Sequence, residues 1–75
     1  MTFETVRDTL AQQFELDPDT ITMDTNIIDD IGADSLDLVE LIMSLEDAYG
    51  ITIGDDDAVK LTTVRKICDY LEALE

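Results

Sequence analysis

Ser35 is the residue whose type and position most directly suggest chemistry. It lies in the segment GADSLD, residues 32–37, at the start of a stretch rich in helix-forming residues. Ser and Asp are both favoured helix caps, so the tripeptide Asp-Ser-Leu alone favours capping. The chain contains no His, which excludes a Ser-His-Asp arrangement and leaves this hydroxyl without a base to activate it. We therefore expect no catalytic residue.

Other residues that could do chemistry give weaker signals. The segment that begins with Asp24 starts like an EF-hand loop, but it lacks an acid at the fifth position and Gly at the sixth. We expect no defined metal site, although loose binding of divalent cations stays open. Pairs of acids for hydrolysis occur throughout so acidic a chain, which makes an enzyme the weakest interpretation. Cys68 falls in an apolar stripe and is interpreted as a core residue.

The charge of the chain is strongly one-sided. It has 19 acidic and 4 basic residues, a net charge of −15, and 15 of the acids lie between Arg7 and Lys60, where there is no Lys or Arg. Such a field repels nucleic acid and anionic membranes and attracts basic patches on other proteins. We expect basic protein surfaces as partners, with no nucleic acid and no membrane insertion. Self-repulsion should also make the fold only marginally stable.

The length and the start of the chain restrict its organisation. Seventy-five residues leave room for one domain with a modest core, so we expect a single domain over residues 1–75. The single cysteine cannot form an internal disulfide, which favours a reducing compartment. The first residues resemble no signal peptide, and no apolar run is long enough to span a membrane. We expect a complete, monomeric, cytoplasmic protein.

Apolar residues at three- and four-residue steps predict helices that would position Ser35. The first covers residues 3–14, with Thr2 as its N-cap, and a long connection, residues 15–34, follows it. Residues 35–49 contain neither Pro nor Gly and predict the strongest helix, which Gly50 ends. A short helix is expected from Asp55 to about Lys60, and a last one over 64–74, capped by Thr62 or Thr63. No strand pattern appears.

The helix predicted over residues 35–49 has more apolar faces than a core requires. One stripe at helical spacing suits the core and consists of Leu38, Leu41, Ile42, Leu45 and Tyr49. A second set, Leu36, Val39 and Met43, is rotated away from it and flanked by acids. A wide buried face could absorb both sets. The alternative is a docking face, in which acids attract a partner and apolar side chains anchor it.

A wider segment around Ser35 points to a known family. Residues 32–41, GADSLDLVEL, resemble the phosphopantetheine attachment motif of acyl carrier proteins. The approach to this motif, residues 28–32, and the segment LTTV, residues 61–64, are also similar to that family, so the resemblance covers essentially the whole chain. It implies an all-α four-helix bundle of three longer helices and one short one. It also implies a 4'-phosphopantetheine arm on Ser35 that carries acyl groups as thioesters between enzymes of fatty acid biosynthesis.

The resemblance also implies two surfaces. Recognition of the phosphopantetheinyl transferase and of acyl-processing enzymes would fall to Asp34, Leu36, Asp37, Val39, Glu40, Met43 and Glu46. A cleft for the acyl chain would be lined by Ile28, Leu45, Ile53, Ala58, Leu61 and Ile67, each of which could equally be an ordinary core residue. Alternatives are a carrier of polyketide or aminoacyl intermediates and, from another class, an acidic module that binds divalent cations or other proteins.

Overall fold

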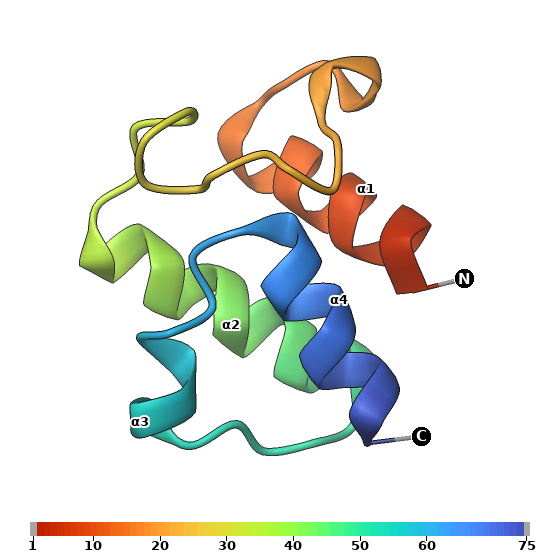
Figure 1. Cartoon of the computed structure of the whole chain (residues 1–75), viewed down its shortest axis with the longest axis vertical. Coiled ribbons are helices and arrows are strands. Elements are labelled where there is room, and N and C mark those ends of the chain that lie inside the picture. The colour runs from red at the N-terminus through yellow and green to blue at the C-terminus, as the bar shows by residue number, and fades with distance from the viewer. Residues whose placement is uncertain (1, 75) are drawn as a thin grey trace.

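Helices joined by irregular segments make up the computed structural model, which describes residues 2–74 (Figure 1). The elements in chain order are α1 (Thr2–Phe14), a 3-10 turn η1 (Pro18–Thr20), α2 (Ser35–Tyr49), α3 (Asp55–Ala58) and α4 (Val64–Ala73). Over the described residues the only strand-like pairing is an isolated bridge between Asn26 and Thr63. The all-α class, with three longer helices and one short one, is therefore confirmed.

The bounds of α2 agree with the sequence prediction at both ends. Asp34 is its N-cap, with an extended backbone. Gly50 ends the helix in the left-handed region, at φ 65°, where a residue without a Cβ is not strained. The amide of Ile51 then donates to the carbonyl of Glu46 across this turn, at 3.1 Å.

The other helices differ from the prediction by one or two residues. Thr2 is a helical residue of α1 and not the cap that precedes it. Helix α3 ends at Ala58 rather than near Lys60, because Lys60 and Leu61 donate to carbonyls only three residues back, in a tight turn. This turn carries the side chain of Leu61 into the core. Thr63, one of two expected caps, caps α4 by accepting a hydrogen bond from the amide of Lys66.

The long connection between α1 and α2 is held against the start of α4. Ile27 is fully buried within it, and its amide donates to the carbonyl of Thr62 at 2.8 Å. In return the amides of Val64 and Arg65 donate to carbonyls of this connection, at 3.1 and 2.8 Å. The first turn of a helix has amides without partners in the helix, so these bonds satisfy α4 and fix the approach to Ser35. Neither η1 nor this pairing was predicted.

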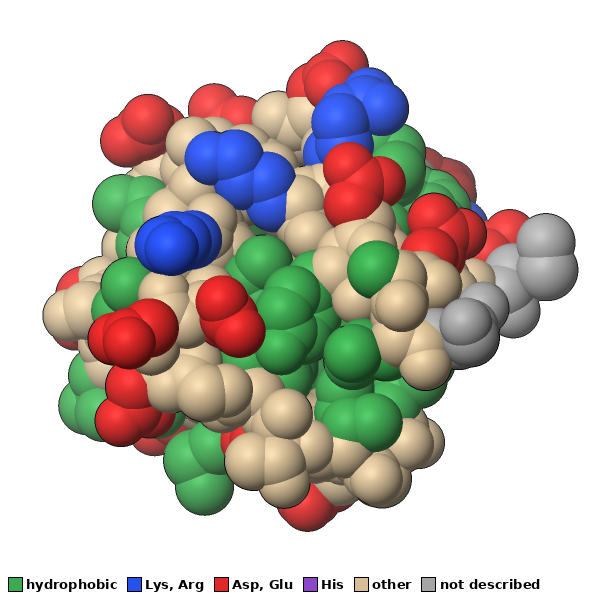
Figure 2. All heavy atoms as spheres, turned by 60° about the horizontal axis from the view of Figure 1, so that its bottom comes forward, with side chains coloured by type: hydrophobic (Ala, Val, Ile, Leu, Met, Phe, Trp, Pro, Cys, Tyr) green, Lys and Arg blue, Asp and Glu red, His purple; other side chains and the backbone are tan. Residues whose placement is uncertain are grey.

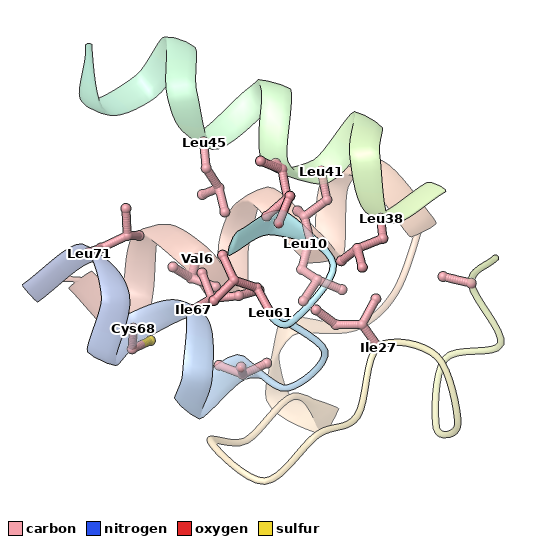
Figure 3. Close-up of a cluster of buried hydrophobic side chains, with 14 of the residues drawn as sticks. Val6, Leu10, Ile27, Leu38, Leu41, Leu45, Leu61, Ile67, Cys68 and Leu71 are labelled. Atoms are coloured by element: carbon pink, nitrogen blue, oxygen red, sulfur yellow. The ribbon is translucent and has the colours of Figure 1, made fainter. Parts of the chain in front are cut away.

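The core lies where α1, α2 and α4 face one another (Figure 3). Leu38, Leu41 and Leu45 extend from α2 towards Val6 and Leu10 of α1 and towards α4, which contributes Ile67, Cys68 and Leu71. No charged or polar residue among those described is buried. The acids are therefore all on or near the surface of an apolar interior.

Candidate attachment site and its surroundings

Ser35 is the first residue of α2, and its side chain is exposed. The cap that precedes it is made by two acids. A carboxylate oxygen of Asp34 accepts from the amide of Asp37 at 2.9 Å, and a carboxylate oxygen of Asp37 accepts from the amide of Asp34 at 3.3 Å. Capping, which the tripeptide alone favoured for both Ser and Asp, therefore falls to Asp34. Within residues 2–74 no group forms a hydrogen bond with the Ser35 hydroxyl.

This position suits a phosphate ester. The helix start carries partial positive charge from the aligned peptide dipoles and presents amides without helical partners. The hydroxyl of Ser35 is accessible to solvent and committed to no internal bond, so a modifying enzyme can reach it without unfolding α2. A long prosthetic group joined through a phosphodiester fits these residues.

An apolar groove opens beside Ser35. It has a volume of about 190 Å³ and is lined by Ile28, Ser35, Leu38, Val39, Ala58, Val59 and Thr62. Val39 and Val59 are exposed, and they bring α2 and the segment after α3 to the same opening. The groove therefore presents an apolar surface directly beside the Ser35 side chain.

The groove includes only part of the cleft expected from the sequence. Ile28 and Ala58 line it. The other four expected residues, Leu45, Ile53, Leu61 and Ile67, are buried in the core and do not line it. Leu38 and Val39 were missed as cleft residues, although they lie three and four positions after Ser35, the spacing that places helical side chains on one face.

The second apolar set on α2 faces solvent. Leu36 is 65% exposed, Val39 45% and Met43 58%, so a wide buried face does not absorb them. Asp34 and Glu40 are exposed beside them. Exposed apolar side chains flanked by carboxylates give this helix a surface that can attract a basic partner and then be desolvated by it.

Two acids expected on the partner face have internal roles. Asp37 is half-buried and completes the cap described above. Glu46 is also half-buried, and its carboxylate oxygen Oε2 accepts from the amide of Ile53 at 2.7 Å. This bond ties α2 to the segment that leads into α3. The sequence gives no signal for it, because the partner is a backbone group in an irregular segment.

Helix α3 has a second tie, to α4. The hydroxyl of Tyr70 donates to Oδ2 of Asp57 at 3.2 Å. Partial burial raises the pKa of Tyr70, and the nearby charge of Asp57 raises it further. The phenol therefore stays protonated and able to donate this bond throughout the neutral range. Together, Glu46 and Tyr70 set the position of α3, which forms one wall of the apolar groove.

Two kinds of site are absent from the described part of the chain. Residues 2–74 contain no group of three or more His, Cys, Asp or Glu side chains arranged to hold a metal ion. None of the helices in this range is long and apolar enough to cross a membrane.

A small helical bundle that presents one unengaged hydroxyl at a helix start, beside an apolar groove, has the features of a carrier domain. The comparisons with known proteins agree. Residues 4–71 match the family described as "Phosphopantetheine attachment site". The chain belongs to this family, that of the acyl carrier proteins, and its prosthetic group is therefore 4'-phosphopantetheine.

Individual relatives cover nearly the whole chain. It is 47% identical over 72 residues to the acyl carrier protein of Campylobacter hominis, a match that covers 96% of this chain and 91% of that protein. The solved structure of a putative acyl carrier protein from Mycobacterium tuberculosis covers 100% of both chains, with a TM-score of 0.91 and 31% identity. That of the acyl carrier protein from Enterococcus faecalis covers 99% of this chain and 94% of its own, with a TM-score of 0.84 and 34% identity.

Proposed function

We propose that the hydroxyl oxygen of Ser35 carries the 4'-phosphopantetheine group through a phosphodiester, and that the chain shuttles acyl groups between enzymes of fatty acid biosynthesis. When bound, this group supplies a terminal thiol that holds acyl groups as thioesters. The proposal depends on one observation: the Ser35 hydroxyl is exposed and unbonded at the start of α2, while Asp34 makes the cap. The family match over residues 4–71 supports it.

The chain itself positions groups and performs no chemistry in this proposal. Asp34 and Asp37 hold the first turn of α2, so that the oxygen of Ser35 has a defined position. Among residues 2–74 no side chain forms a hydrogen bond with this oxygen, and the chain has no His that could act as its base. The base that removes its proton must then come from the transferase. The chain is a carrier and not a catalyst, with residues 1–75 as one carrier domain in the cytoplasm.

The apolar groove is the proposed shelter for the acyl chain. Its walls come from α2, from the end of α3 and from the connection before α2. It therefore opens beside Ser35, the residue that would carry the arm, so the arm can fold back and place its acyl group in the groove. Each methylene group removed from water there contributes about 0.8 kcal/mol. Residues deeper in the core, such as Leu45 and Ile67, would contribute only if the chain displaced them from their present packing.

Partner recognition is the proposed role of the exposed face of α2. Basic enzymes would be attracted by Asp34 and Glu40 and anchored by the exposed apolar side chains of α2, which are Leu36, Val39 and Met43. Glu46 contributes less than the sequence suggested, because part of its carboxylate is engaged with the amide of Ile53.

The attachment is tested by incubating the purified apo chain with coenzyme A and a phosphopantetheinyl transferase, followed by intact mass measurement. The wild-type chain should gain the mass of one arm, and Ser35→Ala should gain none. Thr52→Ala removes another exposed hydroxyl, remote from α2's first turn, and should be modified like the wild type. Modification of Ser35→Ala, or none of the wild type, would refute the assignment.

The cargo is tested separately. The chain is purified from cells that make it, and the group on its thiol is identified by mass spectrometry after release. A fatty acid role predicts saturated and 3-oxygenated straight-chain acyl groups. Aminoacyl groups or branched polyketide chains would instead support the alternative carrier roles.

A further inference from the structure

A second groove lies between α3 and α4, the two helices that are joined by a rising segment in Figure 1. It has a volume of about 370 Å³ and shares no residue with the apolar groove beside Ser35. We call it the lysine groove, and its lining residues are Asp57, Lys60, Leu61, Lys66, Asp69 and Tyr70. The proposed attachment, acyl shelter and docking face leave this groove without a ligand.

The lysine groove contains both lysines of the chain, Lys60 and Lys66. Each arginine is paired with an aspartate elsewhere on the surface. The two lysines are exposed, and within residues 2–74 their ammonium groups form neither a hydrogen bond nor an ion pair. In the described part of the chain, two unpaired cations therefore line one groove of a molecule whose net charge is −15.

The two carboxylates of the groove are not bound to these cations. Asp57 lies three residues before Lys60, and Asp69 lies three residues after Lys66. Neither carboxylate forms an ion pair with its lysine within residues 2–74, and Asp57 instead accepts from the hydroxyl of Tyr70 at 3.2 Å. A lysine ammonium group has three donors and no acceptor. The groove therefore offers unused donors with positive charge.

The rest of the lining is apolar. Leu61 is buried, and Tyr70 is half-buried with its hydroxyl bound to Asp57. The methylene stems of the two lysines can extend this surface, because long cationic side chains cover apolar area while their charged ends stay in water. The volume of about 370 Å³ falls among sites for small organic ligands, which measure roughly 300–1,000 Å³. The groove suits a ligand with an apolar body and an anionic head.

We propose that the lysine groove binds a small organic anion, which is a carboxylate or a phosphate monoester on an apolar body. The anionic head lies between the ammonium groups of Lys60, from the turn after α3, and Lys66, from α4. The body packs on Leu61 and on the ring of Tyr70. Asp69 would repel a head placed further along α4, so the head is restricted to the space between the lysines. This site requires neither a modified Ser35 nor a docked enzyme.

Binding is tested first by NMR with three probes. The ¹⁵N-labelled apo chain is titrated with phenyl phosphate, 3-phenylpropanoate and the uncharged 3-phenylpropanamide in about 0.1 M NaCl, which screens acids more than about 10 Å away. An anion that binds should shift the backbone signals of Lys60, Leu61, Lys66 and Tyr70, and the amide should barely shift them. The anion that binds more tightly identifies the head group. Equal shifts by the amide, or shifts spread evenly over the surface, would overturn the proposal.

Variants with the same change of charge test the location. Lys60→Gln and Lys66→Gln each remove one ammonium group from the groove. The control Arg65→Gln removes the same charge beside Lys66, from a guanidinium that bonds to Asp24 instead. Each lysine variant should raise the Kd of the anion about twofold to fivefold, the effect of one exposed charge contact, and Arg65→Gln should leave it unchanged. Lys66→Arg keeps the charge and should bind like the wild type. A loss in only one lysine variant, or an equal loss in Arg65→Gln, would overturn the site between the lysines.

Thermal unfolding gives an independent measurement. An anion at ten times its Kd should favour the folded wild-type chain about elevenfold, and the melting temperature should rise accordingly. The double variant Lys60→Gln, Lys66→Gln should show a much smaller rise, which also controls for general salt effects of the probe. An equal rise in both chains would mean that the anion acts elsewhere. Both experiments use the apo chain, so they are unaffected if the proposed attachment to Ser35 fails.

Discussion

Glu40 and Glu46 carry the same charge on α2 but have different environments. Glu40 is exposed, and its carboxylate is free to face a partner. Glu46 is half-buried and bound to the amide of Ile53. A hydrogen bond to a charged acceptor is shorter and stronger than one between neutral groups. The 2.7 Å between the Ile53 nitrogen and Oε2 of Glu46 is short, as expected for such a bond. Glu40 is therefore available for partner recognition, whereas Glu46 stabilises the fold, although the sequence gives no reason to distinguish the two.

Glu46→Ala should lower the free energy of unfolding by about 1.5–3 kcal/mol, because the amide of Ile53 loses its charged acceptor. Glu40→Ala, which removes the same charge from an exposed site, should change it by less than about 0.5 kcal/mol. Chemical denaturation of the two variants and the wild type measures this. Equal losses of stability would show that the Ile53 bond contributes little.

Cys68 should make stability depend on alkaline pH. Burial raises the pKa of its thiol above the ordinary value of 9.0, and the charges of Glu72 and Asp69 raise it further. The folded chain thus holds this proton to higher pH than the unfolded chain does. The resulting contribution to stability is complete below the ordinary value and is lost as the pH rises through the folded-state pKa.

Thermal unfolding from about pH 8 to about pH 10.5 measures this contribution. The wild type should lose more melting temperature over this range than Cys68→Ala, in which no thiol titrates. The other groups that titrate there are shared by both chains. If the melting temperatures of the wild type and of Cys68→Ala fell in parallel, ionisation of the thiol would not be coupled to unfolding. In the folded wild type the thiol should also react slowly with thiol reagents, since Cys68 is only 1% exposed.

Helix α2 is the element on which both proposed roles depend, and its two ends are well determined. The capping pair of Asp34 and Asp37 fixes its start, and Gly50 fixes its end. The sequence was sufficient to predict these bounds, because Gly32, Asp34 and Gly50 have strong local preferences. It was insufficient for the pairing of the long connection with α4, for the tie between α3 and α4, and for the role of Glu46. These depend on contacts between separate segments, such as those of Ile27 with Thr62, of Tyr70 with Asp57 and of Glu46 with Ile53.

Asp34→Ala should lower stability by about 1 kcal/mol, the usual cost of losing an N-cap. It should also slow arm transfer, because the first turn of α2, which includes Ser35, loses its fixed start. Asp34→Asn retains an oxygen that can accept from the amide of Asp37 and should be close to the wild type in stability. Chemical denaturation and arm-transfer kinetics of both variants distinguish the effect of losing the capping hydrogen bond from the effect of losing the negative charge. Equal destabilisation would mean that the charge at the helix start matters more than the cap.

At the scale of the whole molecule, the acidic side chains repel one another, and this repulsion lowers the stability of the folded state. The net charge is −15, and every described acid lies outside the core. Figure 2 shows one face of the molecule, on which acids lie both at the edges and beside a central apolar patch, with Lys and Arg in its upper half. Two ion pairs, Arg7 with Asp8 and Arg65 with Asp24, are exposed and contribute little.

Divalent cations should therefore stabilise the fold by reducing this repulsion. Because residues 2–74 present no cluster built to hold a metal ion, Mg²⁺ and Ca²⁺ should act alike, by diffuse screening and loose association with carboxylates. Relief of about 1 kcal/mol would raise the melting temperature by about 4–8 °C in a domain of this size. Calorimetry with millimolar chloride salts of each ion, against NaCl of equal ionic strength, measures it. A flat response would show that repulsion is a minor term, and a saturating effect of Ca²⁺ alone at micromolar concentration would reveal a discrete site instead.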